Sequence, residues 1–269
     1  MPFEDFLTDN EALFRLSIFF GVLVFLGFVE FAFPRRERTF KRAKRWRVNL
    51  AIAVIDTLAL RFLLPILAVG TALWVEMNQI GLLELLNWPG WLEVLLAVIL
   101  LDVLVYGQHV AFHHIPIFWR IHRVHHVDRD IDVTTALRFH PIEIVLSMLL
   151  KIAFVLILGA PVVAVICFEI LLNAMAMFNH SNLRLPMGID RWLRLFVVTP
   201  DMHRVHHSID MIESNRNFGF SLSIWDRIFS TYKAQPDLGH GKMLLGLGEY
   251  QGDESCRLGW TLCFPFFRR

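Results

Sequence analysis

Long apolar segments alternate with short polar or basic segments over the first two thirds of the chain. The apolar runs cover about residues 15–33, 48–75, 91–108 and 142–179. A helix rises 1.5 Å per residue, so roughly 20 apolar residues cross a hydrocarbon core about 30 Å thick. The last run is nearly twice as long as one crossing needs, and Gly-Ala-Pro at 159–161 interrupts it. The pattern predicts an all-α integral membrane helical bundle of about five spans, including one helical hairpin.

Polar positions and a proline modify the second apolar run. Pro65 predicts a kink, because proline cannot continue the helical hydrogen-bond pattern. Asp56 and Arg61 lie in the same run, and charged groups are costly in lipid, so we expect them to face the bundle or each other. The stretch 78–91 is too short and too interrupted to span. It predicts an interfacial helix and turn, with its tryptophans at the level of the lipid headgroups.

Composition supports a membrane protein and excludes other classes. The chain is 55% hydrophobic and 19% charged, whereas soluble domains are about 45–50% apolar and 25% charged. A net charge of +1 creates no field that would favour nucleic acid as a partner. The acidic start, residues 1–15, argues against a cleaved signal peptide. Three cysteines without a CxxC pair argue against a disulfide framework and a thiolate metal site.

The orientation in the membrane follows from one basic segment. Residues 35–47 hold eight arginines or lysines and one glutamate, and such segments stay on the cytoplasmic side. Counting crossings from this loop places residues 109–140 and 180–207 on the same cytoplasmic side, with the N-terminus opposite. We therefore expect a protein of the plasma or inner membrane, or of the endoplasmic reticulum.

Histidines concentrate where the predicted spans end, since eleven of the twelve lie between 109 and 207. His109 and His113 are four residues apart, and His-x-x-His-His occurs at 122–126 and again at 203–207. These spacings put the imidazoles of each segment on one helix face. Neutral imidazole is a common metal ligand, and eight aligned rings exceed the needs of one ion. We predict a dimetal site in a cytoplasmic helical cap, with the two triplets facing each other and the first pair closing it. The predicted ligands are His109, His113, His122, His125, His126, His180, His203, His206 and His207.

Other polar residues near these ligands have predicted supporting or neutral roles. Asp102 lies on the same helix face as His109, so we expect it to accept a histidine N–H and fix the orientation of that ring. His140 is expected to support a ligand in the same way. His114 lies one residue off the ligand face and is excluded, and His240 is expected in a surface loop.

Four segments of the sequence resemble the fatty acid hydroxylase / sterol desaturase superfamily over about residues 95–235. They read "DVLVYGQHVAFHH", "FWRIHRVHHVDRDIDVTTALRFHP", "FNHSNLRL" and "TPDMHRVHHSIDMIESNRNFGFSLSIWDRIFSTY". The family's HxxxH and two HxxHH motifs fall on the eight histidines named for them above. Its additional histidines fall on His140 and His180, while His114 departs from the pattern.

The resemblance implies an oxidoreductase whose two iron ions are held by histidines. It implies O2 as co-substrate and hydroxylation or desaturation of a lipid drawn from the bilayer, which is a sterol, sphingolipid, ether lipid or fatty acyl chain. Electrons would come from a separate donor protein, since motifs for flavin, nicotinamide and haem are absent from the sequence. Zinc can displace iron from an all-histidine site in a purified form.

Two other functional classes stay open on the residues alone. A membrane metal transporter or sensor would bind ions near the middle of the bilayer, away from span ends. A zinc-dependent membrane hydrolase would need a carboxylate base beside the metal, and Glu143 and Glu213 lie outside any HExxH motif. Whichever function applies, we expect one structural domain with three parts. These are N-terminal spans at 1–90, a His-rich catalytic membrane part at 91–235 and a cytoplasmic tail at 236–269.

Overall fold

The structure, a computed structural model, describes residues 10–86 and 88–267; the acidic segment 1–9 lies outside the described residues. Within the described part the named elements are all helical, and five stretches are long and apolar enough to cross a membrane. This confirms the predicted all-α membrane bundle. The spanning stretches are α2 (Glu11–Ala32), α3 (Arg42–Leu63) with α4 (Ala68–Asn78), α5 (Gly90–His114), α7 (Pro141–Leu158) and α8 (Val162–His180).

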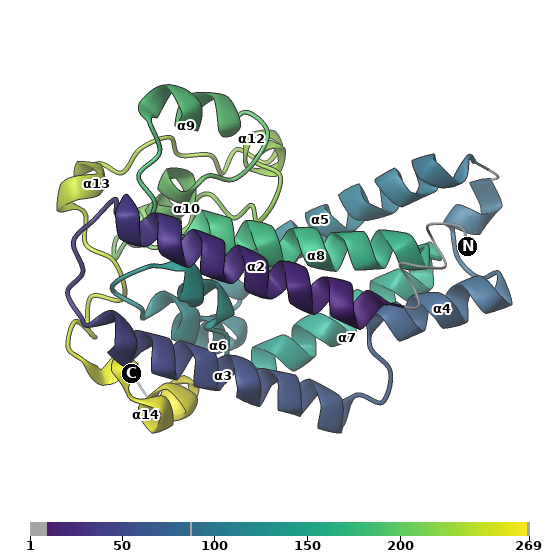
Figure 1. Cartoon of the computed structure of the whole chain (residues 1–269), viewed down its shortest axis with the longest axis horizontal. Coiled ribbons are helices and arrows are strands. Elements are labelled where there is room, and N and C mark those ends of the chain that lie inside the picture. The colour runs from purple at the N-terminus through teal and green to yellow at the C-terminus, as the bar shows by residue number, and fades with distance from the viewer. Residues whose placement is uncertain (1–9, 87, 268–269) are drawn as a thin grey trace.

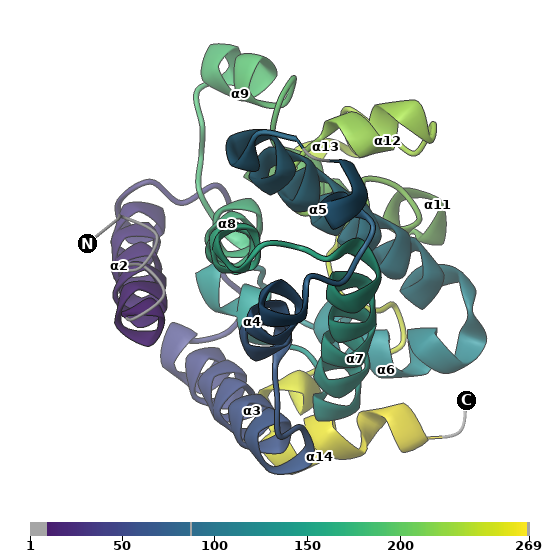
Figure 2. The same ribbon diagram turned by 90° about the vertical axis from the view of Figure 1, so that its right-hand side faces the viewer.

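Helix α8 lies at the centre of the bundle. It contacts α2, α4 and α5, and the end view shows α2, α3, α7 and α5 arranged around α8 and α4 (Figure 2). The outer helices expose apolar side chains instead of polar ones; Phe25, Phe28 and Phe31 of α2 are 64–69% exposed. Such a surface suits contact with lipid tails, because no polar face turns outward.

The predicted hairpin is present between α7 and α8. Helix α7 ends at Gly159, which has a left-handed backbone with φ of 69°, a conformation that glycine adopts without steric cost. A Cβ atom here would lie 2.6 Å from the carbonyl oxygen of Ile80 and 2.9 Å from the Cα of Gly81. The hairpin bend therefore packs backbone against backbone on the segment that follows α4.

The prediction of a kink in the second segment is wrong in detail. Pro65 breaks the second span into α3 and α4 instead of kinking it, because the preceding Leu64 is extended as the residue before a proline prefers to be. The stretch 78–91, predicted as a non-spanning helix and turn, contains a turn and a short 3₁₀ helix, η1 (Leu83–Leu86). Leu83 is buried in the apolar cluster of the hairpin, while Trp88 and Trp91 are 42% and 69% exposed, so their expected contact with lipid headgroups stays a prediction.

Shorter elements form a cap at one end of the bundle, on the left in Figure 1. They include α6 and α10, which carry the two histidine triplets, and segments from the C-terminal part of the chain. Helix α14 contacts α3, so the end of the chain packs against its N-terminal third. The cap elements are α6 (Pro116–His126), η2 (Val133–Leu137), α9 (Met187–Leu193), α10 (Pro200–His206), α11 (Met211–Ser214), α12 (Ile224–Ile228), α13 (Gly239–Lys242), η3 (Glu254–Cys256), α14 (Leu258–Cys263) and η4 (Phe264–Phe266).

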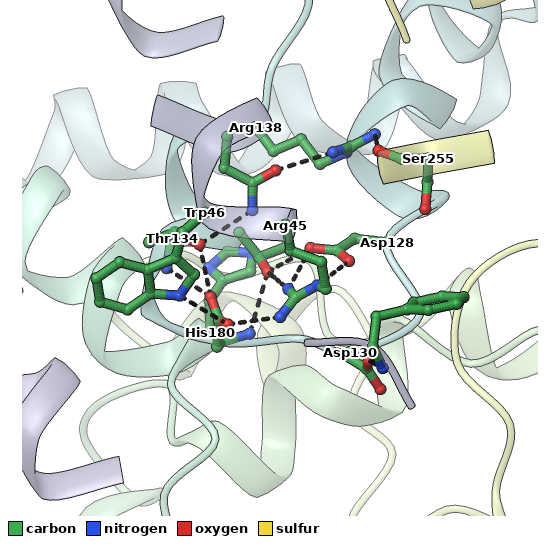
Figure 3. Close-up of polar contacts among 12 residues, drawn as sticks. Arg45, Trp46, Asp128, Asp130, Thr134, Arg138, His180 and Ser255 are labelled. Atoms are coloured by element: carbon green, nitrogen blue, oxygen red, sulfur yellow. Dashed lines mark hydrogen bonds and ion pairs between the residues drawn. The ribbon is translucent and has the colours of Figure 1, made fainter. Parts of the chain in front are cut away.

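The basic loop and the start of α3 hold the cap to the spans. Arg45 is buried and donates to Asp128 at 2.6 and 2.8 Å and to Asp132 at 2.5 Å. In Figure 3 its guanidinium points toward Asp128. Arg35 pairs with Asp201 at 3.0 Å. The buried pairs of Arg45 fix geometry, since removing one partner leaves an uncompensated charge.

Candidate metal centre

Four helices deliver the nine predicted ligand histidines to one buried place. His109 and His113 lie near the end of α5, and His180 is the last residue of α8. The first triplet lies on α6, and the second lies on α10 and the residue after it. All nine side chains are at most 7% exposed. Pro116 and Pro200 occupy the first turns of α6 and α10, where proline is tolerated because that N–H has no helical partner.

The nine imidazoles form two groups, each with one nitrogen per residue within 4.8 Å of the others. The first group has five members: His109, His113, His122, His126 and His206. The second group has four members: His125, His180, His203 and His207. We call them the five-histidine cluster and the four-histidine cluster. The rings of His126 and His207, one from each cluster, stack at 4.5 Å between centroids, so the clusters adjoin.

Each triplet is divided between the two clusters, and the division is reciprocal. In the first triplet the outer residues His122 and His126 join the five-histidine cluster, while the middle residue His125 joins the other. In the second triplet the middle residue His206 joins the five-histidine cluster, and the outer two join the other. Successive residues on a helix are about 100° apart around its axis. The residues three and four positions after the first histidine therefore lie on opposite sides of it. The His-x-x-His-His spacing therefore lets one short helix serve two neighbouring clusters.

Hydrogen bonds at the Nδ1 atoms orient most of these rings. His109, His180 and His206 donate to backbone carbonyl oxygens at 2.7–2.8 Å. His122 donates to a carboxylate, Oε1 of Glu143, at 2.7 Å. Because a carbonyl or carboxylate oxygen only accepts, Nδ1 carries the proton and Nε2 keeps its lone pair. The carbonyl acceptors belong to Phe218, Ala176 and Arg216.

The Nε2 atoms show that this site fits metal ions. His125 and His180 both donate through Nδ1 to carbonyl oxygens, yet their Nε2 atoms face each other at 3.0 Å. Two lone pairs at that distance repel unless a cation lies against both. In the five-histidine cluster, Nε2 of His109, His122 and His206 is buried with no hydrogen-bond partner in the described part of the chain. Orphaned nitrogens of this kind are what bound metal ions would satisfy.

Burial also keeps the cap histidines neutral, which is the form that binds metal. Burial lowers the pKa of His122 to about 3. For the other five histidines outside the spans, burial first and neighbouring imidazoles second hold the pKa well below its usual value. These five are His125, His126, His203, His206 and His207.

Two predicted supporting residues do not contact the clusters. Oδ2 of Asp102 accepts from Trp225 Nε1 at 2.8 Å and from the backbone N–H of Leu222 at 3.2 Å, so it binds the cap segment instead of a histidine. His140 caps α7, accepting from the N–H of Ile142 through Nδ1, and its Nε2 donates to a C-terminal carbonyl oxygen. Both residues fasten elements together, and neither orients a ligand.

Other residues have roles or positions that differ from those predicted from the sequence. Glu143, considered there only as a hydrolytic base, orients His122. The amide oxygen of Asn215 lies 3.2 Å from Nδ1 of His113. A carboxylate in the first turn of an apolar span was the available signal for Glu143. His240 is not a surface residue, because it is only 5% exposed, whereas His114 is exposed outside both clusters.

A cavity of about 410 Å³ opens among the spans and reaches the five-histidine cluster. His109 and His122 form part of its wall, together with Phe112 and Phe139. Its size is in the range of small-ligand sites, about 300–1,000 Å³. The histidines therefore adjoin a space that is large enough for part of a lipid and is enclosed largely by apolar side chains.

Comparisons with known proteins agree with the histidine pattern. A family model described as fatty acid hydroxylase matches residues 94–231, which are 138 of the 269 residues of the chain. Ornithine lipid hydroxylase OlsE of Rhizobium tropici is 30% identical over 56% of this chain and 44% of its own length. Human alkylglycerol monooxygenase is 30% identical over 58% of this chain and 33% of its own length.

A third relative is lathosterol oxidase of Mus musculus, 26% identical over 54% of this chain and 47% of its own length. The aligned part thus spans less than half the length of these relatives. No solved structure matches the chain. Because the family model covers the segment that carries both clusters, and covers more than half of the chain, this protein belongs to the fatty acid hydroxylase family within the fatty acid hydroxylase / sterol desaturase superfamily.

Proposed function

We propose that this protein is a membrane-bound oxygenase that hydroxylates or desaturates a C–H bond of a lipid, with two iron ions and O2. The observation that carries the proposal is the pair of histidine clusters beside a cavity among the spans. Relatives named as a lipid hydroxylase, a monooxygenase and a sterol oxidase support the same class. The substrate is a sterol, sphingolipid, ether lipid or fatty acyl chain.

The five and four imidazole nitrogens suit one metal ion per cluster. When bound, a pair of iron ions would supply the redox chemistry for reducing O2 and attacking an unactivated C–H bond. Hydroxylation inserts one oxygen atom into the substrate and reduces the other to water, which consumes two electrons and two protons. We assign the electrons to a separate donor protein, since the sequence has no motif for a redox cofactor of its own.

The protein's own residues would place the substrate and exclude water. Side chains from α3, α5, α7 and α8 line the cavity, so a lipid can enter from the bilayer and reach the His109 and His122 wall. Glu143 holds the Nδ1 proton of His122 and keeps Nε2 free to bind metal. Phe112 and Phe139 give that wall an apolar surface, which favours hydrocarbon over water.

We further propose that the clusters lie on the cytoplasmic side and that the N-terminus lies opposite. All nine histidines belong to the end of the bundle where the basic loop 35–47 lies. Arg45 of that loop contacts Asp128 directly after the first triplet, which ties the basic loop and the histidines to one face. The membrane would be a plasma or inner membrane, or the endoplasmic reticulum.

Geometry disfavours the two alternative functions. A transporter would hold its ion near the bilayer midplane, whereas these histidines lie where α5 and α8 end. A zinc hydrolase would need a free carboxylate base. Glu213 accepts from the N–H of Asp237, and Glu143 holds the Nδ1 proton of His122 through Oε1, which leaves only its Oε2 without a partner among the described residues.

The proposal is tested by lipid analysis of cells that produce the wild type or single variants. His206→Ala removes a member of the five-histidine cluster and His125→Ala one of the four-histidine cluster, while His114→Ala is the matched control outside both. We expect an O2-dependent lipid with one added oxygen, or two fewer hydrogens, only with the wild type and the control. Unchanged lipids in every strain, or activity of the zinc form without O2, would reject the oxygenase.

A further inference from the structure

One carboxyl group in the cavity has no partner. Asp56 of α3 lines the cavity and is only 6% exposed. Its Oδ1 is fully buried and forms no hydrogen bond within the described residues. The sequence suggested Arg61 as a partner, but no ion pair between the two is seen in the part of the chain that the structure describes. Asp56 therefore presents a free acceptor to the space where the substrate would lie.

Several other polar groups of the cavity form hydrogen bonds or ion pairs with one another. Glu169 accepts from Lys151 at 2.7 Å and from Arg15 at 2.6 Å, which closes a charge network at one part of the wall. Gln108 donates to the hydroxyl of Ser147 at 2.6 Å. Glu143 also has one oxygen, Oε2, without a partner, but its Oε1 accepts from His122, whereas Asp56 forms no hydrogen bond within the described residues.

An unpaired carboxyl group at membrane depth is costly, and an apolar residue would remove that cost. Asp56 lies well below the cap: Asn49, seven residues earlier on α3, donates to Thr134 of η2 at 3.0 Å. Seven residues of helix correspond to about 10 Å. The acceptor thus lies within the spans and away from the cap.

We propose that Asp56 binds a hydrogen-bond donor of the lipid substrate: a hydroxyl, an amide N–H or an ammonium group. The hydrocarbon part fills the rest of the cavity, with the reacting carbon at the His109 and His122 wall. This inference rests on the proposed function, because it takes the cavity as the substrate site. It narrows the substrate to lipids that carry a hydrogen-bond donor group, and it excludes plain hydrocarbon chains.

The test measures ligand binding to the purified full-length protein in detergent, through the rise in thermal midpoint at increasing ligand concentration. The probes are matched pairs with and without a donor. They are 1-O-hexadecylglycerol and its di-O-methyl ether, N-hexadecylacetamide and its N-methyl form, and hexadecylammonium and hexadecyltrimethylammonium. We expect the wild type to bind the donor member of at least one pair at least about tenfold more tightly. The pair that discriminates identifies the donor class.

Substitutions separate recognition from a structural role. Asp56→Leu should reduce the discrimination to less than about twofold, and the methylated probe should bind at least as tightly as to the wild type, because the unpaired polar group is gone. Asp56→Asn keeps an acceptor oxygen, so it should retain preference for a hydroxyl or amide and lose preference for ammonium. Leu60→Ala, one helical turn further along the same cavity wall, is the control and should weaken both members of a pair equally.

Three results would overturn the inference: no discrimination by the wild type in any pair, wild-type discrimination in Asp56→Leu, or equal weakening of both members in Asp56→Leu. The last result would assign Asp56 a structural or proton-carrying role. Binding is read without turnover, so this outcome is separate from failure of the proposed function. That failure would appear as iron-loaded wild type that forms no O2-dependent product.

Discussion

The arginine and valine that follow the first histidine of each triplet contact residues outside the two clusters. Arg123 donates to the carbonyl oxygen of Phe264 at 2.7 Å and lies 4.2 Å from the centroid of its ring. Arg204 pairs with Asp201 and donates to a carbonyl oxygen at the end of α8. Val124 and Val205 are fully buried. The repeated pair therefore fixes how each triplet is turned toward the clusters.

Glu143 should control the affinity of only one cluster. Glu143→Leu removes the acceptor of His122, and loss of such an orienting partner typically lowers metal affinity about 10- to 100-fold. His122 belongs to the five-histidine cluster, so metal content after a chelator challenge should fall from two ions toward one. His140→Asn is the control on the same helix, because it keeps a capping acceptor and contacts neither cluster. Loss of both ions, or of neither, would contradict this role.

Spacing predicts which histidines can meet, but it does not predict their supporting partners. The three short segments each align their rings, and the structure brings all of them together with His180. Asp102 shares a helix face with His109, yet seven residues of rise separate them by about 10 Å, which is beyond hydrogen-bond reach. Its partner comes from a segment 123 residues away, and nothing local in the sequence indicates that pairing.

At the scale of elements, the hairpin bend shows how local and tertiary signals combine. Gly-Ala-Pro was sufficient to predict the bend between α7 and α8. The contact of Gly159 with Gly81 was not predictable, because it joins the bend to a segment near residue 80. The same contact packs the residues just before the short 3₁₀ helix η1 against the hairpin bend. Pro65 likewise indicated an interruption, and only packing decided between a kink and a break.

Gly159→Ala should destabilise the protein. The alanine would have to adopt a left-handed backbone, and its Cβ would collide with the carbonyl oxygen of Ile80. We therefore expect the free energy of unfolding to fall by about 2 kcal/mol or more, with a lower thermal midpoint. Gly107→Ala is the control, because that position is exposed on α5 and has no atom near the added Cβ. Its midpoint should be unchanged or slightly higher. An unchanged midpoint for Gly159→Ala would contradict the packing argument.

At the scale of the whole molecule, charge joins parts of the chain that are far apart in sequence. The basic loop was read as an orientation signal, and the structure adds that Arg45 and Arg35 pair with acids 83 and 166 residues away. Arg36 donates to the carbonyl oxygens of His240 and Met243. Periodicity and local spacing contain no information about such pairings. The bundle could therefore be predicted from the sequence, whereas the attachment of the cap could not.

His240, which lies in the cap, should make the free energy of unfolding depend on pH. Burial lowers its pKa to about 4, against attraction from Asp201 and together with repulsion from Arg204, Arg35 and Arg194. The unfolded chain has a histidine pKa of about 6.5, so between pH 6.5 and 4 the unfolded state binds more protons and stability falls as pH falls. His240→Leu should reduce that slope by up to about 1.4 kcal/mol per pH unit. His114→Leu, at an exposed position, should follow the wild type; parallel profiles for all three would reject the assignment.

The reciprocal division of the triplets has a consequence for biosynthesis. Both clusters need residues of the second triplet, His206 in one and His203 with His207 in the other. Neither cluster can be complete until residue 206 has left the ribosome, and by then the helix α8, which ends at His180, has already been synthesised. No shorter nascent chain contains a finished cluster, so neither site can be filled with its full set of ligands before the bundle beneath it has been made.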